Sequence, residues 1–413
     1  IKGWLWVDDG AGAGGCPDWA TPYENVASTK PGRVVAPWGR SGDDLYMLYT
    51  GGTTGMPKGV MWRQDDLVGT LAANFVTLVD GDGNPDLEAG RALIAQPGGK
   101  SLPACPLMHG TGAFTAFSTL STAGCIVTLT NRTFDADELL DTIEANKVNV
   151  IAIVGDAFGK PMLRALESHP GRWDLSSLIA VVSSGVMWSE ETKQGLLKHH
   201  GGMILSDNFS SSEALGMGAS VSSAGGTSNT AKFALGENAR VITDDGRDVE
   251  PGSGEVGMVA VKGRTPVGYY KDPEKSEKTF KVIDGSRYSV PGDFATVEAD
   301  GTLRLLGRGS VCINTGGEKV FPEEVEEVLK THPDVRDAVA VGVPDEKWGE
   351  AICAMVEPVP GVVLDEADVI AHVKSRLAAF KAPKRVISVE TIGRAANGKV
   401  DYKRLKAEAA ARV

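Results

Sequence analysis

The chain has 413 residues, which is too long for one ordinary hydrophobic core and predicts two or more domains. Its composition is that of a globular protein, with 42% apolar and 23% charged residues. The net charge is −12 without any Lys-rich or Arg-rich run, which argues against a nucleic-acid partner, and no apolar run approaches the length of an integral membrane span.

Cysteine and histidine usage argues against a metal centre built from these residues. The five cysteines are scattered without C-x-x-C spacing, and we expect them to be free thiols in a reducing cytoplasm. The adjacent pair His199 and His200 falls at a predicted helix end and is interpreted as surface. No signal peptide is recognisable, so the expected location is cytoplasmic.

The first half of the chain predicts a layered α/β region. From Tyr46 to about Gly216, strand-like apolar runs alternate with helical patterns. The runs 126–129, 150–154 and 178–182 are continuous and apolar, as is typical of strands buried on both faces. Between the first two, residues 136–143 have the apolar spacing of a helix.

The second half changes character twice. From about Phe233 to Leu306, short runs such as 254–256, 259–263 and 302–306 predict a small β subdomain. A compact α+β module follows. Its first predicted helix is 322–329, with proline early and acids in the first turn, and its second is marked by the apolar residues Val369, Ile370, Val373 and Leu377.

The most informative segment is Tyr49–Gly59, which reads YTGGTTGMPKG and directly follows a predicted strand. Its glycines turn the chain tightly, its backbone N–H groups and threonine hydroxyls suit an anion, and Lys58 adds a positive charge. The spacing is not that of a P-loop, because Lys58 lies between Pro57 and Gly59. Taken alone, the segment suits a polyphosphate site or an exposed glycine turn.

Further motifs follow in a fixed order along the chain. They read PLMHGTG at 106–112, SSGVM at 183–187, DNFSSSE at 207–213, YSVPGD at 288–293, GRGSVCINTGG at 307–317 and GRAANGKV at 393–400. Together with the glycine loop they resemble the motifs of the adenylate-forming superfamily of AMP-dependent synthetases and ligases. Residues 49–63 and 307–326 are most similar to bacterial acyl-CoA synthetases of the fatty-acyl or steroid-side-chain type.

The resemblance implies a large, layered α/β domain with a small β subdomain, and a small, mobile α+β domain at the C-terminus. On this pattern the large domain covers residues 1–309, with its β subdomain at about 217–307. The C-terminal domain covers 310–413, with the hinge near 308–312. Only 48 residues precede Tyr49. Because relatives carry more, we expect part of the large domain to precede Ile1.

The resemblance also assigns residues to ATP and Mg²⁺. The nucleotide-binding residues that it implies are Thr50, Gly51, Gly52, Thr53, Thr54, Gly55, Gly185, Asp207, Asn208, Phe209, Asp293 and Arg308. The catalytic residues that it implies are Lys58, Ser212, Glu213 and Lys399. Within this set Glu213 holds Mg²⁺, a cation that prefers oxygen ligands, Asp293 accepts the ribose hydroxyls, and Lys399 bridges the carboxylate and ribose oxygens.

The remaining assignments concern the other substrates, a small-molecule carboxylate and coenzyme A. The acyl pocket is assigned to Met108, His109 and Gly216, the coenzyme A tunnel to Gly316 and Gly317, and the hinge to Ser310. The implied reaction is ATP-dependent activation of a hydrophobic carboxylate as an acyl-adenylate, followed by transfer to coenzyme A. The sequence leaves the oligomeric state open.

Several positions depart from the family pattern. Gly51 replaces serine, Phe209 replaces tyrosine, Ser310 replaces the usual Asp or Lys of the hinge, and Asn314 replaces lysine. Two alternatives therefore stay open: an acyl-AMP ligase that delivers to a carrier protein, and a catalytically silent nucleotide-binding paralogue. The presence of Glu213 and Lys399 argues against the silent paralogue.

Overall fold

The computed structural model describes residues 3–8, 10, 14–28, 37–50, 57–73, 86–226, 231–395 and 398–413. The chain divides into two compact units, Ile1–Asp44 and Leu45–Val413. In the first unit, β1 (Leu5–Trp6) pairs in parallel with β2 (Thr21–Pro22), and α1 (Tyr23–Ala27) follows. The rings of Trp4 and Trp19 meet edge to face at 5.9 Å.

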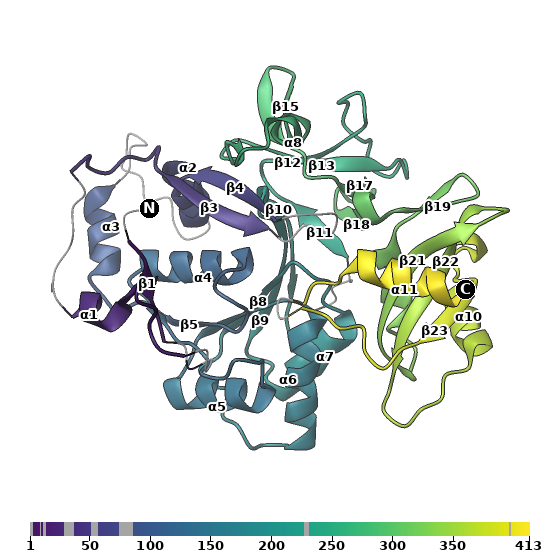
Figure 1. Ribbon diagram of the computed structural model, residues 1–413, viewed down its shortest axis with the longest axis horizontal. Coiled ribbons are helices and arrows are strands. Elements are labelled where there is room, and N and C mark those ends of the chain that lie inside the picture. Colours follow the sequence, from purple (N-terminus) through teal and green to yellow (C-terminus); the bar gives the residue numbers. More distant parts are fainter. Residues whose placement is uncertain are drawn as a thin grey trace. The chain divides into compact units, whose positions relative to one another are not determined.

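The second unit is built on a 13-stranded sheet, and one half of this sheet is parallel. The parallel strands are β5 (Lys100–Pro103), β6 (Cys125–Ile126), β7 (Val150–Ile153), β8 (Ala180–Ser184) and β9 (Ile204–Ser211). Figure 1 shows α5 (Ala136–Asn146), α6 (Asp156–Ser168) and α7 (Glu190–His199) on one face and α4 (Gly110–Ser121) on the other. The predicted layered α/β region is confirmed.

The largest hydrophobic core lies between the parallel strands and helices α5, α6 and α7. Leu102, Ile151 and Val181 point to this face and are 0% exposed, in contact with a cluster that includes Leu140 and Met162. Because successive side chains of a strand alternate between faces, their neighbours Ser101, Val150 and Val182 point toward α4. The two faces therefore differ in chemistry, one a dry core and the other the lining of a cleft.

The other half of the sheet is antiparallel and extends from β9. It contains β10 (Ala214–Ser222), β11 (Lys232–Leu235), β12 (Ala239–Ile242), β13 (Gly257–Lys262), β15 (Phe280–Ile283), β16 (Ser286–Ser289), β17 (Asp293–Val297) and β18 (Leu303–Arg308). The predicted β subdomain thus continues the main sheet through the pairing of β10 with β11. Helix α8 (Pro273–Thr279) precedes β15.

A separate three-stranded sheet contains β3 (Leu45–Thr50), β4 (Lys58–Arg63) and β14 (Gly268–Tyr269), and β4 is its middle strand. The strand predicted before the glycine loop is β3. Helices α2 (Gln64–Ala73) and α3 (Leu87–Ile94) follow β4. The buried side chains Leu48, Val60 and Trp62 pack with Phe114 of α4, which fixes β3 and β4 against that helix.

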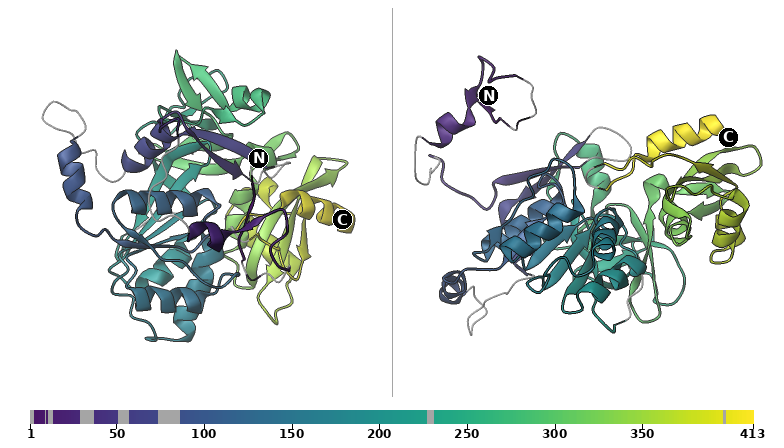
Figure 2. Two further views of the ribbon diagram at one scale, coloured as in Figure 1. Left: turned by 60° about the vertical axis from the view of Figure 1, so that its left-hand side comes forward. Right: turned by 90° about the horizontal axis from the view of Figure 1, so that it is seen from below.

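The C-terminal part has its own five-stranded sheet of β19 (Ile313–Thr315), β20 (Glu318–Val320), β21 (Val335–Asp345), β22 (Gly349–Pro358) and β23 (Arg385–Ser388). Two separate cores show that helices cover both faces of it: α9 (Pro322–Leu329) and α10 (Glu366–Lys374) on one, α11 (Tyr402–Arg412) on the other. Figure 2 shows these elements as one module. The predicted α+β class is confirmed.

Three local predictions differ from the structure. Residues 254–256 lie outside any strand, because Gly252 and Gly254 adopt left-handed φ values of 77° and 74° that break strand pairing. Of the predicted run 126–129, only Ile126 pairs as a strand, in β6 (Cys125–Ile126). Leu377 lies beyond the end of α10 at Lys374, although it still packs on the same core.

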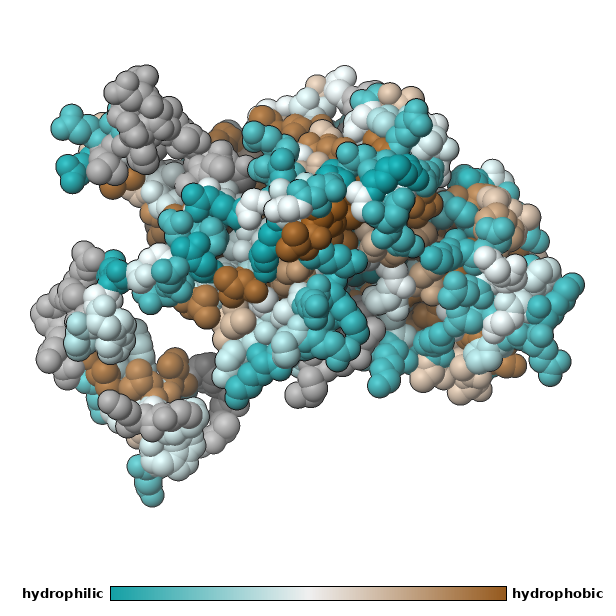
Figure 3. Space-filling view, turned by 90° about the horizontal axis from the view of Figure 1, so that it is seen from above, coloured by the Kyte–Doolittle hydropathy of each residue, from teal (hydrophilic) through white to brown (hydrophobic). Residues whose placement is uncertain are grey.

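The boundary predicted at 309/310 falls in a short 3-10 helix (Gly309–Val311) between β18 and β19; its role as domain boundary and hinge stays a prediction. All five cysteines are free thiols. Among the described residues, no helix is both long and apolar enough to cross a membrane. On the face seen in Figure 3, hydrophilic side chains predominate and apolar ones form separate groups.

Candidate active site

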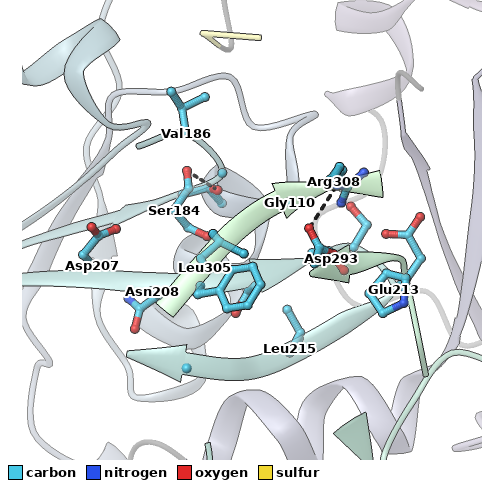
Figure 4. Close-up of a pocket in the computed structure, with 18 of the residues that line it drawn as sticks. Gly110, Ser184, Val186, Asp207, Asn208, Glu213, Leu215, Asp293, Leu305 and Arg308 are labelled. Atoms are coloured by element: carbon cyan, nitrogen blue, oxygen red, sulfur yellow. Dashed lines mark hydrogen bonds and ion pairs between the residues drawn. The ribbon is translucent and has the colours of Figure 1, made fainter. Parts of the chain in front are cut away.

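A single cleft of about 2540 Å³ collects most of the motif residues. The loops after β8 and β9 line it, together with β17, β18 and the segment around Lys399. Figure 4 shows labelled residues of the loops after β8 and β9 and of β17 and β18 around one space. The carboxyl ends of neighbouring parallel strands meet at one edge of a sheet, where open α/β folds bind their ligands, and this explains why motifs far apart in sequence come together.

Asp293 and Arg308 form a charged pair in the cleft, in which the Asp293 side chain is buried and the Arg308 side chain is 43% exposed. They begin β17 and end β18, they are register partners, and Arg308 Nε donates to Asp293 Oδ1 at 3.2 Å. Burial raises the pKa of the Asp293 carboxyl, while the negative charge of Asp293 raises the pKa of Arg308. The second oxygen, Oδ2, is buried without a hydrogen-bond partner among the described residues, which leaves an acceptor for hydroxyl groups of a ligand.

Glu213 lies where β9 turns into β10 and is only 7% exposed. The Tyr269 hydroxyl donates to Glu213 Oε1 at 2.8 Å, and the Ser289 hydroxyl donates to the Glu213 carbonyl at 2.7 Å. Burial and the negative charge of Glu213 raise the pKa of Tyr269, so Tyr269 stays a donor. Neighbouring Ser212 lines the cleft, and its carbonyl accepts from Trp62 Nε1 at 2.9 Å.

Lys58 and Thr50 are register partners at the ends of β4 and β3, and both line the cleft. Lys58 Nζ pairs with Asp272 Oδ2 at 2.9 Å and lies 5.5 Å from the centre of the Tyr269 ring. The residues between these two strands include Gly51, Gly52, Thr53, Thr54 and Gly55, which lie outside the described residues. The structure therefore places both ends of the glycine loop at the cleft.

His109 and Gly185 face each other at the start of α4 and the end of β8. His109 is the N-cap of α4, and its Nδ1 accepts from the Thr111 N–H at 3.4 Å. A Cβ on Gly185, whose φ is +95°, would lie 3.5 Å from His109 Cε1. Burial, and secondarily the charge of Lys399, lower the pKa of His109 to about 4, so the imidazole is neutral near pH 7. This suits a wall residue rather than an acid or base.

The two other residues assigned to the acyl pocket are placed differently from each other. Gly216 lines the cleft at an irregularity between β9 and β10, where it has a φ of +71°. Met108 does not line the cleft: its side chain is 83% exposed in the turn that precedes α4. The assignment of Met108 to the acyl pocket is corrected, because the turn that precedes α4 directs this residue to solvent.

Asp207, Asn208 and Phe209 line the cleft from β9, with alternate side chains on opposite faces. Phe209 packs on Phe233 with ring centres 5.6 Å apart. The Asp207 carboxylate pairs with Lys193 Nζ of α7 at 3.4 Å, and Lys193 is 1% exposed. Burial raises the pKa of Asp207 to about 6, against the opposing charge of Lys193. Asp207 therefore anchors β9 to α7, whereas the neighbouring Asn208 side chain faces the other way.

The segment around Lys399 is a tight turn that reaches into the cleft. Gly398 donates to the Ala395 carbonyl at 2.8 Å, and Ala395 donates to the Lys399 carbonyl at 2.9 Å. A Cβ on Gly398, at φ +75°, would touch Ala157 at 3.1 Å and Val154 at 3.4 Å. Only glycine allows this close approach of the turn to the large sheet.

Arg394 clamps this turn to the C-terminal sheet. Its Nε and Nη2 donate to the two carboxylate oxygens of Asp337 at 2.7 and 2.9 Å, and its Nη1 donates to the Gly398 carbonyl at 3.1 Å. A bidentate guanidinium–carboxylate pair fixes orientation as well as distance. Lys399 is therefore held in the cleft, where burial and the charge of Arg308 lower its pKa, while the charge of Glu213 opposes that shift.

Gly316 and Gly317 lie at the turn between β19 and β20, and neither lines the cleft. Gly316 donates to the Trp348 carbonyl at 2.8 Å, and both glycines have left-handed φ values, of 61° and 89°. Ser310 does line the cleft, within the 3-10 helix that joins the two sheets. The structure thus places Lys399 at the cleft and leaves the two glycines outside it.

Glu323, at the start of α9, is a buried carboxyl group against the strand that carries Arg308. Its Oε1 accepts from the Arg308 N–H at 3.4 Å, and its Oε2 is buried without a partner among the described residues. A Cβ on Gly307 would collide with this carboxyl, so the glycine permits the contact. Burial, and secondarily the negative charge of Glu326, raise the pKa of Glu323 to about 8; Asp293 acts in the same direction.

This contact predicts a pH dependence of stability. Because the pKa of Glu323 is raised in the folded protein, its contribution to the free energy of unfolding is complete below the ordinary carboxyl range. This contribution is lost as the pH rises through about 8. We expect Glu323→Gln to lose less stability than the unmodified protein between pH 5 and 9 in thermal unfolding, by about 1.4 kcal/mol per unit of pKa shift. Glu324→Gln is the control, because it removes a neighbouring carboxylate of the same helix that is paired with a cation, Lys381, at 2.6 Å. Equal pH profiles of stability for all three proteins would contradict the prediction.

Sequence reasoning missed four residues that shape the site: Lys193, Tyr269, Glu323 and the clamp role of Arg394. Lys193 and Arg394 find their partners Asp207 and Asp337 across different elements, and no local spacing connects them. The sequence around Tyr269 indicates only a short edge strand, which is β14. A signal existed for Arg394 alone, because it belongs to the glycine turn that presents Lys399.

Comparisons with known proteins identify the class. The family described as AMP-binding enzyme matches residues 8–270, and the family described as AMP-binding enzyme C-terminal domain matches residues 324–399. The chain belongs to the AMP-binding enzyme family, whose members form adenylates, and it is an enzyme. The resemblance read from the ordered motifs is confirmed.

Two curated relatives and two solved structures illustrate the similarity. A medium/long-chain-fatty-acid–CoA/3-oxocholest-4-en-26-oate–CoA ligase of Mycobacterium marinum is 40% identical over 393 residues, 94% of this chain and 71% of that protein. A 3-oxocholest-4-en-26-oate–CoA ligase of Rhodococcus rhodochrous is 43% identical over 373 residues, 88% of this chain and 66% of that protein.

Among solved structures, ATP-bound MatB from Rhodopseudomonas palustris is similar with a TM-score of 0.71 and 27% identity, over 90% of this chain and 69% of that one. The amide bond synthetase McbA from Marinactinospora thermotolerans is similar with a TM-score of 0.68 and 27% identity, over 88% of this chain and 69% of that one. These similarities agree with the large α/β part and the smaller C-terminal part of the fold.

Proposed function

We propose that this protein is an ATP-dependent acyl-CoA ligase that activates a hydrophobic carboxylate as its acyl-adenylate and transfers the acyl group to coenzyme A. The observation that carries the proposal is the meeting of Asp293 and Arg308, Glu213 and the Lys399 turn in one cleft. The names of the curated relatives support a fatty or steroid acid as substrate and coenzyme A as acceptor. Its free thiols suit a cytoplasmic location.

In the first half-reaction a carboxylate oxygen attacks the α-phosphorus of ATP, the bond to the β-phosphate oxygen breaks, and pyrophosphate leaves. Negative charge moves onto phosphoryl oxygens, and the reaction needs positioned positive groups rather than a protein nucleophile. Lys399 neutralises the approaching carboxylate, and Asp293 holds the ribose through its unpaired Oδ2. Lys58, Thr50 and the glycine loop hold the leaving phosphates, and Ser212 donates to the α-phosphate.

The adenine lies between the Gly185 backbone and Phe209 in this proposal, with Asn208 at its edge. Both aromatic packing and a glycine without a side chain suit a flat ring. The buried pair of Lys193 and Asp207 keeps β9 in register beneath this position. Because His109 is neutral, the carboxylate meets one positive charge, that of Lys399, at this end of the cleft.

A Mg²⁺ ion fits the site at Glu213. The residue offers a carboxylate with one oxygen hydrogen-bonded to Tyr269, and it lines the same cleft as Lys58 and Thr50, which are assigned to the phosphates. Mg²⁺ characteristically takes one or two carboxylates and completes its shell with phosphate oxygens and water. When bound, it neutralises charge on the phosphates; Glu213 holds it and is itself oriented by Tyr269 and Ser289.

In the second half-reaction the thiolate sulfur of coenzyme A attacks the acyl carbon, the mixed anhydride bond breaks, and AMP leaves. We assign this step to a second arrangement, in which the C-terminal domain (310–413) turns about Ser310 and brings Gly316 and Gly317 to the cleft. The structure supports a rotation because Lys399 and these glycines belong to one sheet module and only Lys399 lies at the cleft. Each is needed in a different half-reaction.

The test is a pyrophosphate-release screen over carboxylates of increasing length, with and without coenzyme A. We expect carboxylate-dependent release of pyrophosphate, and a thioester only when coenzyme A is present. Adenylate that forms but passes to a phosphopantetheine carrier protein instead of coenzyme A would favour the carrier-dependent ligase. ATP binding without any carboxylate-dependent pyrophosphate would favour the silent paralogue.

A further inference from the structure

Lys58, which we assign to the leaving phosphates, is paired with an acid that does not line the cleft. Lys58 Nζ lies 2.9 Å from Asp272 Oδ2. Lys58 is one of the residues that line the cleft, whereas Asp272 is not. The positive charge that the phosphates need is therefore already in contact with a carboxylate beside the cleft, and the two anions must share it.

The backbone holds both ends of this pair in place. Lys58 begins β4, and the Tyr270 N–H donates to the Gly59 carbonyl at 2.8 Å, which joins the end of β14 to β4 beside Lys58. Asp272 is the N-cap of α8, where its Oδ1 accepts from the Lys275 N–H at 3.1 Å. The other oxygen, Oδ2, faces Lys58. The contact thus joins a strand end to a helix cap, and only the lysine side chain in it is long and flexible.

The pair is charged but accessible, and so it can exchange partners. The hydrogen bond from Lys58, and secondarily that from the Lys275 N–H, lower the pKa of Asp272, so this group is a carboxylate near pH 7. The side chains of Lys58 and Asp272 are 39% and 33% exposed. Ion pairs at such positions contribute little free energy, because water and salt screen the charges. A polyphosphate with several negative charges can therefore take Lys58 from Asp272.

Tyr269 keeps Lys58 near the proposed metal ligand. The Lys58 ammonium lies 5.5 Å from the centre of the Tyr269 ring, and the Tyr269 hydroxyl donates to Glu213 Oε1 at 2.8 Å. Lys58, Tyr269 and Glu213 all line the cleft. Because an aromatic face attracts a cation, the ring holds the ammonium at the cleft while it is paired with Asp272.

We infer that Asp272 competes with the phosphates for Lys58. On this model, which rests on the proposed function, Lys58 pairs with Asp272 before ATP binds, turns to the phosphates of ATP, and returns to Asp272 as pyrophosphate leaves. Asp272 thereby weakens the binding of pyrophosphate and promotes its release. Asp272 is a positioning residue, because it acts through Lys58 and does not touch the reacting atoms.

The experiment measures the Kd of inorganic pyrophosphate, with Mg²⁺ present, by calorimetry on the protein and its variants. We expect Asp272→Asn to bind pyrophosphate about twofold to fivefold more tightly, the range for an exposed ion pair. Asparagine also serves as an N-cap, and a variant that only loosened α8 would bind more weakly. Glu277→Gln is the matched control, because it removes one negative charge from an exposed position of the same helix.

A double-mutant cycle with Lys58→Met separates competition from simple repulsion. Competition for the lysine predicts that the gain from Asp272→Asn disappears when Lys58 is replaced. Repulsion between Asp272 and pyrophosphate predicts the same gain in both backgrounds. An equal gain in both backgrounds, a gain of the same size in Glu277→Gln, or no gain in Asp272→Asn overturns the inference.

The inference and the proposed function can fail separately. Carboxylate-dependent thioester formation by the unmodified protein keeps the ligase proposal intact, whichever way the cycle comes out. Unchanged pyrophosphate binding in Lys58→Met alone overturns the assignment of Lys58 to the phosphates, and the inference with it. Absence of pyrophosphate release with every acid overturns the proposed function itself. A thermal unfolding curve of each variant shows whether the fold is preserved.

Discussion

Lys399→Ala is expected to lower acyl-adenylate formation on the order of a hundredfold or more, the effect of deleting a preorganised charged stabiliser. The same variant should still convert supplied acyl-adenylate and coenzyme A to thioester. The reason is that the turn of Gly398 and Lys399 is docked against Val154 and Ala157, where the lysine serves the attack on ATP. The measurements are single-turnover pyrophosphate release for the first step and thioester formation for the second.

The complementary variant is Gly317→Leu, which should spare adenylation and impair the thioester step. Among the described residues, no atom lies within 4 Å of a Cβ at Gly317 in this arrangement, so a side chain there would obstruct only a site that approaches the backbone closely. Gly317→Ala is the matched control, because it introduces the same strain at a φ of +89° without the bulk. If Lys399→Ala and Gly317→Leu lost both steps equally while remaining folded, one fixed arrangement would serve both half-reactions.

Much of the site could be predicted because its residues lie at the ends of strands. Gly185 follows β8, Glu213 ends the β9 turn, and Asp293 begins β17, so the motif positions and the strand pattern agree. The topology then brings these ends to one edge without any special side-chain contact. The turn at Lys399 was predictable for a different reason: a glycine just before the lysine allows a tight turn to present it.

The side chains that hold the motifs in place were not predictable. The pairs of Lys193 with Asp207 and Arg394 with Asp337 each join two separate elements, and their partners have no fixed spacing. The strand prediction for residues 254–256 was wrong because β-propensity says little where glycines adopt left-handed conformations.

Glu213→Gln is expected to reduce acyl-adenylate formation on the order of a hundredfold or more. The substitution keeps the shape of the side chain and removes its charge, which acts on Lys399 and, after the larger effect of Asp293, on Arg308. Without this charge, the proposed Mg²⁺ ligand is lost and the positive charge of Lys399 is less balanced. Two measurements apply: single-turnover pyrophosphate release, and calorimetric binding of ATP with and without Mg²⁺.

Tyr269→Phe tests whether the negative charge of Glu213 or the orientation of its carboxylate matters more. It removes the hydrogen bond to Oε1 but keeps the carboxylate, so we expect a loss of about threefold to tenfold. A much larger effect for Glu213→Gln than for Tyr269→Phe assigns the role to the negative charge. Comparable losses in the two variants would assign it to the hydrogen bond by which Tyr269 orients Glu213. Near-normal turnover of Glu213→Gln, with Mg²⁺ still required for ATP binding, would place the metal ligand elsewhere in the cleft.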